Sequence, residues 1–558
     1  MANNEYLLKK KHFENRFATL KAQRAPYEPN WKEINTYFGV GTGSWDAPSS
    51  TPRAKEAFYG KNINTLPTRY AQNLAASLVA TLTPSNMRWF GYTVTNETRE
   101  ERIYLRWCSE RILDLFNRSG LNSFLNNSFL EAALYGVNPL GIDWSTKERR
   151  YTFFPMTIGQ FWVGRNQDFV VDQLYHRFGM TVREIADRFG EDKLTAQMKL
   201  DLSMDRTEAV YTIVHAIEEN PRYLPAFDNP YNKRYISAYY IEDANAEGFL
   251  EWKTTSKFPW NVSSWGIDPE TVYCPGIGYY ALGDVKSLQT YEEDLAVASA
   301  KMINPPVKGS TSLKTKEKDI SAGGITYTDD PAAFTPLFQV QYDINTALQN
   351  IQRILERLYE LFYNNVFYAL MNKNKTMSAT EAAGINTEKM TLLGAVVERL
   401  QSTLLGPLLE NAFLLAWENG ALEDETHKMP ETLRGKTLEV TYHSLMAQTQ
   451  SLTDLRLVDD WLQRISILSA INPNAARKPD IMELAEYYAK KYDIDMSFVV
   501  PKETIEAQDR AAAQAAAEER QAQAAAMNIE NVQGMASAAK DFAVANEKNP
   551  NVQEILGV

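Results

Sequence analysis

The chain contains five histidines, whose imidazole rings can serve both as metal ligands and as general bases. They are scattered and match no spacing that metal sites or proteases use. No HExxH, GxSxG or P-loop motif occurs, and the glycines of GVGTGS at 39–44 do not fit a dinucleotide-binding loop. Each histidine is therefore predicted to be an ordinary polar or core residue. The five are His12, His176, His215, His427 and His443.

Acidic residues form adjacent pairs or runs at 292–294, 329–330 and 459–460. A metal-dependent nuclease needs carboxylates that converge on its metal ions. Neighbouring positions on a helix point in different directions, so these runs are expected to be solvated or to lie at interfaces. We predict no catalytic residues, no metal site and no cofactor.

Lysines form two further groups that could carry chemistry. One group lies in an irregular segment, 304–339, and the other in a short polar stretch between two long helices. Either group could contact nucleic acid or an acidic partner, and either could equally be a solvated loop. The first group is Lys308, Lys314, Lys316 and Lys318, and the second stretch contains Lys373, Asn374, Lys375 and Thr376.

Composition limits what these residues can do. The 558-residue chain has a formal net charge of −12 and only two cysteines, Cys108 and Cys274, which match no redox or metal spacing. An acidic chain is not built to grip DNA phosphates tightly, but it could line a channel through which DNA passes. The charged start of the chain is no signal peptide, and the most apolar stretch, 392–417, is broken by charges and a proline, so no membrane segment is predicted.

The elements that would position these residues are predicted to be α+β and mainly α. Apolar spacing favours helices over 4–24, 62–82 and 97–136, the last broken near Gly120. From 137 to 280 short β-rich runs alternate with turn residues, which is typical of antiparallel sheet. One helix, 182–189, interrupts them. The predicted runs are Tyr151–Phe154, Phe161–Val163, Phe169–Val171, Ala209–Ala216, Tyr235–Ile241 and Gly248–Trp252.

Long helices dominate the second half. One is predicted over 283–303, ended by two prolines, and one over 340–371. A capping box, Ser378 with Glu381, starts a long helix to about 419 that Gly406-Pro407 should bend. A strand over 437–442 and two or three helices between 446 and 492 follow. Eleven of the twenty residues 507–526 are alanine, which favours a helix that is marginal unless neighbouring copies pack on it.

From about residue 5 to about 500, the order of these elements resembles the portal, or head-to-tail connector, proteins of short-tailed bacteriophages. The likeness begins at Arg24-Ala-Pro-Tyr27 and is strongest at Lys375-Thr-Met-Ser-Ala-Thr-Glu-Ala-Ala383. The other matching positions are Trp31, Tyr37, the helix 62–82 with Leu82-Thr83-Pro84, Trp89, Asn304-Pro305-Pro306-Val307, Glu388-Lys389, Leu393-Gly394, Arg399-Leu400 and Pro407-Leu408.

The resemblance implies a portal fold with wing, stem, clip and crown. Its parts would be a wing over 1–282, including the β-rich part 137–280; stem helices over 283–303 and 340–371; a clip over 304–339; a tunnel loop over 372–378; a long kinked helix and wing/crown junction over 379–439; a crown over 440–500; and a helical barrel or tail over 501–558.

The resemblance further implies a homo-oligomeric ring of about twelve subunits at one capsid vertex of the virion, assembled in the host cytoplasm. Double-stranded DNA would pass through its channel during packaging, retention and ejection. Lys373, Asn374, Lys375 and Thr376 would face the DNA, and the four clip lysines would dock the terminase and then a tail adaptor. Major capsid and scaffolding proteins would be further partners, with no membrane and no enzymatic activity.

Two other classes of protein stay open on the residues alone. A virion-associated metal-dependent nuclease or hydrolase would need a convergent acidic or histidine cluster. A scaffolding or internal core protein would account for the Ala/Gln-rich tail, but the β-rich, aromatic-rich middle of the chain speaks against a simple helical scaffold.

Overall fold

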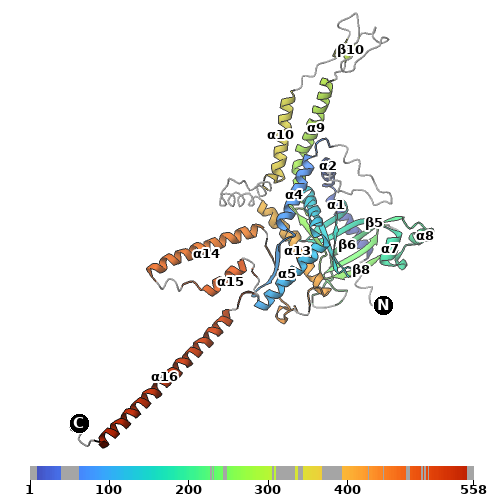
Figure 1. The fold of residues 1–558 in the computed structure, drawn as a ribbon. Helices are drawn as coiled ribbons and strands as arrows, with labels where there is room; N and C mark the ends of the chain where they lie inside the picture. Colours follow the sequence, from blue (N-terminus) through green and yellow to red (C-terminus); the bar gives the residue numbers. More distant parts are fainter. Residues whose placement is uncertain are drawn as a thin grey trace. The chain divides into compact units, whose positions relative to one another are not determined.

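The structure is a computed structural model that describes residues 9–38, 62–225, 229, 231–242, 248–303, 307–309, 334–336, 343–366, 393–424, 427–443, 445–472, 478–491, 494, 498–500 and 502–548. The chain forms two compact units (Figure 1). The first consists of Met1–Glu97 and Tyr104–Ala447, the second of Thr98–Ile103 and Gln448–Val558. The prediction of an α+β, mainly helical chain with antiparallel sheets is confirmed.

Helices make up most of the described N-terminal region. The predicted break near Gly120 is confirmed, because this glycine has a left-handed φ of 69° between two helices. The helix predicted from residue 62 begins at Leu66, because the Asn64 side chain accepts the Leu66 N–H at 3.0 Å and forms a turn before it. These helices are α1 (Lys10–Arg24), α2 (Glu28–Phe38), α4 (Leu66–Leu82), α5 (Arg99–Ser119) and α6 (Leu121–Tyr135).

The β-rich part forms two antiparallel sheets. The three-stranded sheet has the order β3-β2-β9, and the five-stranded sheet the order β4-β5-β6-β7-β8. The three-stranded sheet consists of β2 (Val137–Ser145), β3 (Arg150–Pro155) and β9 (Trp260–Ser264). The five-stranded sheet consists of β4 (Phe161–Arg165), β5 (Val171–Thr181), β6 (Val210–Glu219), β7 (Tyr235–Ile241) and β8 (Glu251–Thr255).

Two strand predictions need correction. The run Phe169–Val171 is mostly a turn, since Phe169 has a φ of 61° and the Asn166 side chain accepts the Val170 N–H; only Val171 belongs to β5. The run Gly248–Trp252 lies largely before β8, which starts at Glu251. The prediction also missed β2, where Pro139 and Gly141 weaken the strand pattern although both residues pair with β9.

A small helical lobe connects β5 to β6. Helix α7 (Val182–Phe189) has the predicted bounds, and its Thr181–Glu184 capping box fixes its start. A 3-10 turn (Glu191–Lys193) and α8 (Ala196–Ser203) complete the lobe.

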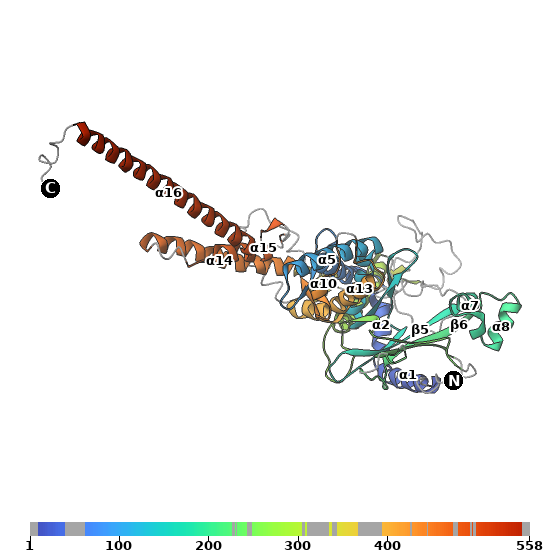
Figure 2. The same cartoon turned by 90° about the horizontal axis from the view of Figure 1, so that it is seen from below.

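Helix α1 covers one face of the five-stranded sheet (Figure 2). Its buried Phe13, Phe17 and Leu20 form a core with sheet residues such as Trp162 and Tyr175. Phe17 stacks on Tyr175 at 5.4 Å and meets Trp162 edge-on at 4.8 Å. The apolar face of this helix is therefore the face that contacts the sheet.

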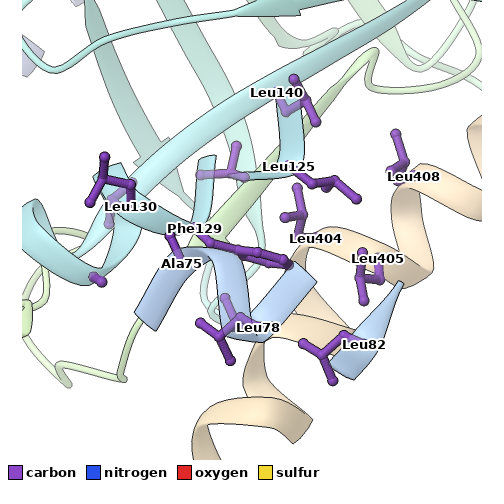
Figure 3. Packing of buried hydrophobic residues seen from close by; sticks show 14 of the residues in the cluster. Ala75, Leu78, Leu82, Leu125, Phe129, Leu130, Leu140, Leu404, Leu405 and Leu408 are labelled. Carbon is purple, nitrogen blue, oxygen red and sulfur yellow. The ribbon is translucent and has the colours of Figure 1, made fainter. Parts of the chain in front are cut away.

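The main core of the first unit joins segments far apart in the sequence. Figure 3 shows side chains of α4, α6, β2 and the segment 404–408 packed together. Strand β1 (Phe90–Val94) pairs with β12 (Leu438–Tyr442), close to the predicted strand 437–442. The predicted start of a crown at 440 therefore falls inside a strand of the first unit, and the second unit takes up the chain at Gln448.

The helix that follows residue 393 changes its hydrogen bonding before Pro407. Residues 393–400 are α-helical, Gln401–Leu405 form a π-helical turn, and α13 (Gly406–Glu418) continues the helix. Pro407 has no N–H and its ring would clash with a regular preceding turn, which a π turn relieves. The helix ends before Gly420, which has the left-handed φ of 66° expected of a helix stop. Residues 372–392, including the predicted Ser378–Glu381 capping box, lie outside the described residues.

The second unit is helical in its described part. It contains most of α14 (Leu445–Ile471), then α15 (Ile481–Lys491) and α16 (Lys502–Lys548), a helix of 47 residues. The predictions of two or three helices over 446–492 and of a helical alanine-rich tail are confirmed. Described side chains of α16 are almost all exposed, including Met527, Val532 and Met535.

Candidate interaction site on the α9–α10 hairpin

Two long helices, α9 (Ile277–Ile303) and α10 (Ile344–Leu361), pack against each other as a hairpin (Figure 1). Two short strands, β10 (Val307–Gly309) and β11 (Phe334–Pro336), lie between α9 and α10 in the sequence. They pair with each other in antiparallel orientation. The first lysine group lies in the sequence between these two helices, and of this group only Lys308 falls within the described residues.

Both helix predictions need new bounds. Helix α9 starts six residues before the predicted 283, because Gly276 and Gly278 let its first turn lie against the end of α6; a Cβ on Gly278 would stand 2.5 Å from the Leu134 carbonyl oxygen. Helix α10 ends at Leu361, residues 364–366 are helical again after a two-residue turn, and the predicted end near 371 lies outside the described residues. Phe362 leaves the helix and turns its fully buried ring into the core, and Tyr363 takes a left-handed φ of 55°.

An apolar stripe at helical spacing joins α10 to α9. The buried residues of α10 are Ala347, Ile351, Ile354 and Leu358. Asp343 starts this helix by accepting the Asn345 N–H at 3.0 Å, and hydrogen bonds from Thr346 hold the pKa of Asp343 below its ordinary value. Arg357 donates to Asp284 of α9 at 2.7 Å, which adds one exposed ion pair between the helices.

The root of the hairpin is fixed by buried hydrogen bonds. Gln289 is 6% exposed, and its Oε1 accepts the N–H groups of Ile63 and Asn64 at 2.8 and 3.0 Å while its Nε2 donates to the Asn64 carbonyl. Tyr70 of α4 meets Tyr359 of α10 edge-on at 5.4 Å. These contacts make the inner half of the hairpin part of the core.

The outer half is different. Beyond Gln289, Ala298 is the one residue of α9 that is buried, and Val297, Met302 and Ile303 are 45%, 47% and 85% exposed. Leu348 of α10 is 48% exposed. Soluble surfaces rarely group apolar side chains in this way unless another surface covers them. The outer half of the hairpin is therefore a candidate protein contact.

The predicted site residues fall mostly outside the described residues. Lys308 lies in β10 opposite Thr335, and nothing is described of its side chain. The predictions for Lys314, Lys316 and Lys318, and for Lys373, Asn374, Lys375 and Thr376, lie outside the described ranges.

Several histidines take ordinary positions in the fold. His12 lies 2.6 Å from Glu218, His427 stacks on Trp107 at 4.6 Å, and His176 and His215 lie in the five-stranded sheet. Within the described ranges, no three His, Cys, Asp or Glu side chains are placed to hold a metal ion, and no helix is long and apolar enough to cross a membrane.

Sequence reasoning missed a second feature of the first unit, a cavity between the segment 256–272 and the helix around Arg399. Its lining includes Arg399, Lys257 and Trp260, and Arg399 lies more than a hundred residues from the other two. No motif joins them, so the sequence carries no signal for this cavity.

Comparison with known proteins places this architecture in a class. The profile of the family described as "Bacteriophage head to tail connecting protein" matches residues 10–499, and the chain belongs to this family. The probable portal protein of Bordetella phage BPP-1 is 26% identical over 553 residues, which cover 97% of each chain. The portal protein of Salmonella phage epsilon15 is 25% identical over 537 residues, 94% of each chain.

Solved structures give a weaker likeness. A chain from the virion of a native gene transfer agent particle has a TM-score of 0.31 and 10% identity, over 76% of this chain and 93% of that one.

Proposed function

We propose that this chain is the subunit of a portal ring, through which a bacteriophage packages, retains and ejects its DNA at one vertex of the capsid. The family match over residues 10–499 is the observation that carries this proposal. Two relatives named as portal proteins, matched over nearly their whole length, support it. In this role the chain is a structural connector and not an enzyme.

The layout of the subunit is part of the proposal. The α9–α10 hairpin is the stem, with its start moved to Ile277, and the segment 304–343 is the clip. Residues up to about 276 form the wing. The loop near 372–378 is the tunnel loop, the helices from 448 to about 500 are the crown, and α16 contributes to a barrel.

The stem assignment has physical support in the hairpin itself. Its inner half is tied to the core by Gln289 and Tyr359, while Val297, Met302, Ile303 and Leu348 are exposed farther out. A helix that stands beside copies of itself in a ring buries such side chains against its neighbours. The exposed apolar residues are thus surfaces that ring formation would cover.

Partners follow from this role. The clip lysines, Lys308, Lys314, Lys316 and Lys318, are proposed to dock the packaging terminase and later a tail adaptor. Lys373 and Lys375, beside Asn374 and Thr376, are proposed to contact DNA. With a net charge of −12 per subunit, the ring would be acidic overall, so such lysines would give weak contacts that are independent of DNA sequence. Capsid and scaffolding proteins would be further contacts, and assembly would take place in the host cytoplasm.

Native mass spectrometry and electron microscopy of the purified full-length protein test this proposal. We expect closed rings of about a dozen subunits with a central hole. A protein that stays monomeric at high concentration would contradict it.

A further inference from the structure

A cavity of about 510 Å³ lies in the first unit, between the segment 256–272 and the helical residues 399–411. Its walls are tied together: Asn411 donates to the Phe258 carbonyl at 3.1 Å and to Asn261 at 3.0 Å, and the Ser264 N–H donates to Thr403 at 3.3 Å. Strand β9 and the π-helical turn therefore hold the cavity open in a fixed shape.

Two buried donors that line this cavity lack acceptors among the described residues. Trp260 is 9% exposed, and its indole Nε1 is buried without a hydrogen-bond partner. The Nε of Arg399 is likewise buried and unpartnered. Lys257 is exposed and adds a cation to the lining, where the carboxylates of Glu410 and Glu418 act on it. A buried donor without an acceptor costs about 1–3 kcal/mol, so a ligand that brings acceptors is favoured here.

Electrostatics of the cavity favour an anion. Four cationic and three acidic side chains line it, and one of the cations, Arg234, is paired with Glu219 at 3.2 Å. Burial lowers the pKa of Arg399, and the nearby Arg165 guanidinium acts in the same direction. Burial also lowers the pKa of Lys257. A bound carboxylate would relieve both effects.

The rim of the cavity is apolar. Phe169, Val170 and Ile267 line it and are 44%, 57% and 63% exposed. A second cavity of about 750 Å³ shares Lys257 and Glu410 as lining residues and adds the exposed Trp417. A free inorganic anion would leave these side chains uncovered, whereas a peptide segment would bury them.

We propose that this cavity is the receptor half of the contact between neighbouring subunits, and that Arg399, Lys257 and Trp260 bind a carboxylate-bearing, partly apolar segment of a second copy of the chain. This inference rests on the proposed ring. A closed ring is built from head-to-tail contacts, so each subunit must carry two different and complementary surfaces. The acidic composition of the chain supplies the carboxylates, and an apolar-rimmed cavity with two buried, unpartnered donors is their complement.

Cross-linking tests the identity of the occupant. We would place the photoreactive p-benzoylphenylalanine at Ile267 in the full-length protein and irradiate assembled rings. Covalent dimers are expected, with the cross-linked peptide of the second copy containing Asp or Glu. Cross-links that form only within one chain, or none at all, would overturn the proposal.

Charge variants test the anchor. Arg399→Gln combined with Lys257→Gln should raise the subunit concentration at which rings dissociate by roughly tenfold or more. Arg399→Lys should have a smaller effect, and the matched control Arg118→Gln, a side chain 62% exposed, should have none. The melting temperature of the dissociated subunit is measured in parallel, and we expect the double variant to leave it unchanged.

The outcomes separate this inference from the proposed function. If the wild-type chain forms rings and the double variant forms rings of the same stability, this inference alone is overturned. A wild-type chain that never assembles would overturn both. A third outcome combines two observations: inorganic phosphate raises the melting temperature of dissociated subunits, and variant and wild-type rings are equally stable. This result would assign the cavity to a free anion and overturn the subunit contact.

Discussion

His176 and His215 face each other across neighbouring strands of the five-stranded sheet. The His215 ring stacks on Tyr239 at 3.8 Å, and its Nε2 lies 2.9 Å from the Ser237 hydroxyl oxygen. Burial lowers the pKa of His176 to about 4 and also lowers the pKa of His215 well below 6.5. The sheet is therefore built around two neutral imidazoles.

These histidines predict a pH dependence. Below the ordinary pKa of 6.5 the unfolded chain binds protons that the folded sheet does not, so the free energy of unfolding falls as the pH drops from about 6.5 toward 4. The slope is about 1.4 kcal/mol per pH unit for each histidine. Melting temperatures can be measured by tryptophan fluorescence at pH 7 and pH 5. The fall in melting temperature between these pH values should be smaller for the double variant His176→Gln, His215→Gln than for wild type.

Asp172 provides the control for that experiment. Burial raises the pKa of Asp172 from 3.8 to about 6, so its contribution to stability is present at low pH and is lost as the pH rises through 6. Asp172→Asn should therefore steepen the loss of stability on acidification. An equal loss of stability on acidification in the double histidine variant and in wild type would contradict the assignment of this pH dependence to the two histidines.

The proposed tunnel-loop lysines give a second prediction at the residue scale. Lys373→Gln with Lys375→Gln should change the amount of DNA packaged or retained by about twofold or more, because the loop loses its cationic contacts to phosphate. Ring images should stay the same. Packaging and retention at wild-type levels, measured as DNA per particle, would refute the role in DNA contact.

The clip lysines give a third prediction at the residue scale. Lys314→Glu, Lys316→Glu and Lys318→Glu together reverse three charges on the segment proposed to dock the terminase and the tail adaptor. We expect the variant ring to bind one of these partners roughly tenfold more weakly. Binding assays with each purified partner check this, and two unchanged affinities would refute it.

At the scale of elements, the passage from α6 to β2 decides how the stem helix is rooted. Gly136 closes α6 with a φ of 95°, its carbonyl accepts the Trp265 N–H at 2.8 Å, and a Cβ here would stand 1.8 Å from the Cys274 carbonyl oxygen. A Cβ on Gly276, just before α9, would stand 2.7 Å from the Gly136 nitrogen. Backbone contact at this point sets where α9 begins.

Substitution of this glycine tests that account. Gly136→Ala should lower the free energy of unfolding by about 3 kcal/mol, since the residue meets both a left-handed φ and a backbone clash. Gly120→Ala is the matched control: its φ is 69°, but nothing lies within 4 Å, so only about 1 kcal/mol is expected. Equal effects in denaturant titrations would mean that the close approach contributes nothing.

At the scale of the whole molecule, the long C-terminal helix adds length without adding core. At 1.5 Å per residue, the 47 residues of α16 extend for about 70 Å. Its described side chains are almost all exposed, so it buries almost no apolar surface within its own chain.

Truncation tests this division. A chain that ends at Val500 should fold with a melting temperature within about 2 °C of the full-length value, because no described core residue is lost. Rings of the truncated chain should lack the central density of a barrel in electron images. Calorimetry measures the melting temperature of both chains. A large fall in the truncated chain would show that α16 packs on the rest of the chain.

Much of this protein was determined by local sequence. The apolar faces of α1 and α10, the break at Gly120, the capping box of α7 and the stop at Gly420 follow from spacing and from single residues whose conformational preferences act within one turn. The order of these elements and their motifs was enough to indicate the connector family, which the match over 10–499 confirmed.

Tertiary structure alone decided the rest, because the deciding contacts join residues far apart in the chain. Strand β2 forms despite Pro139 because β3 and β9 pair with it, and α10 ends at Leu361 because Phe362 turns into the core. Likewise, Lys257, Trp260 and Arg399 meet at one cavity only because β9 packs on a π-helical turn more than a hundred residues later. A sequence pattern records neighbours within a few residues, and Arg399 lies more than a hundred residues from Lys257 and Trp260.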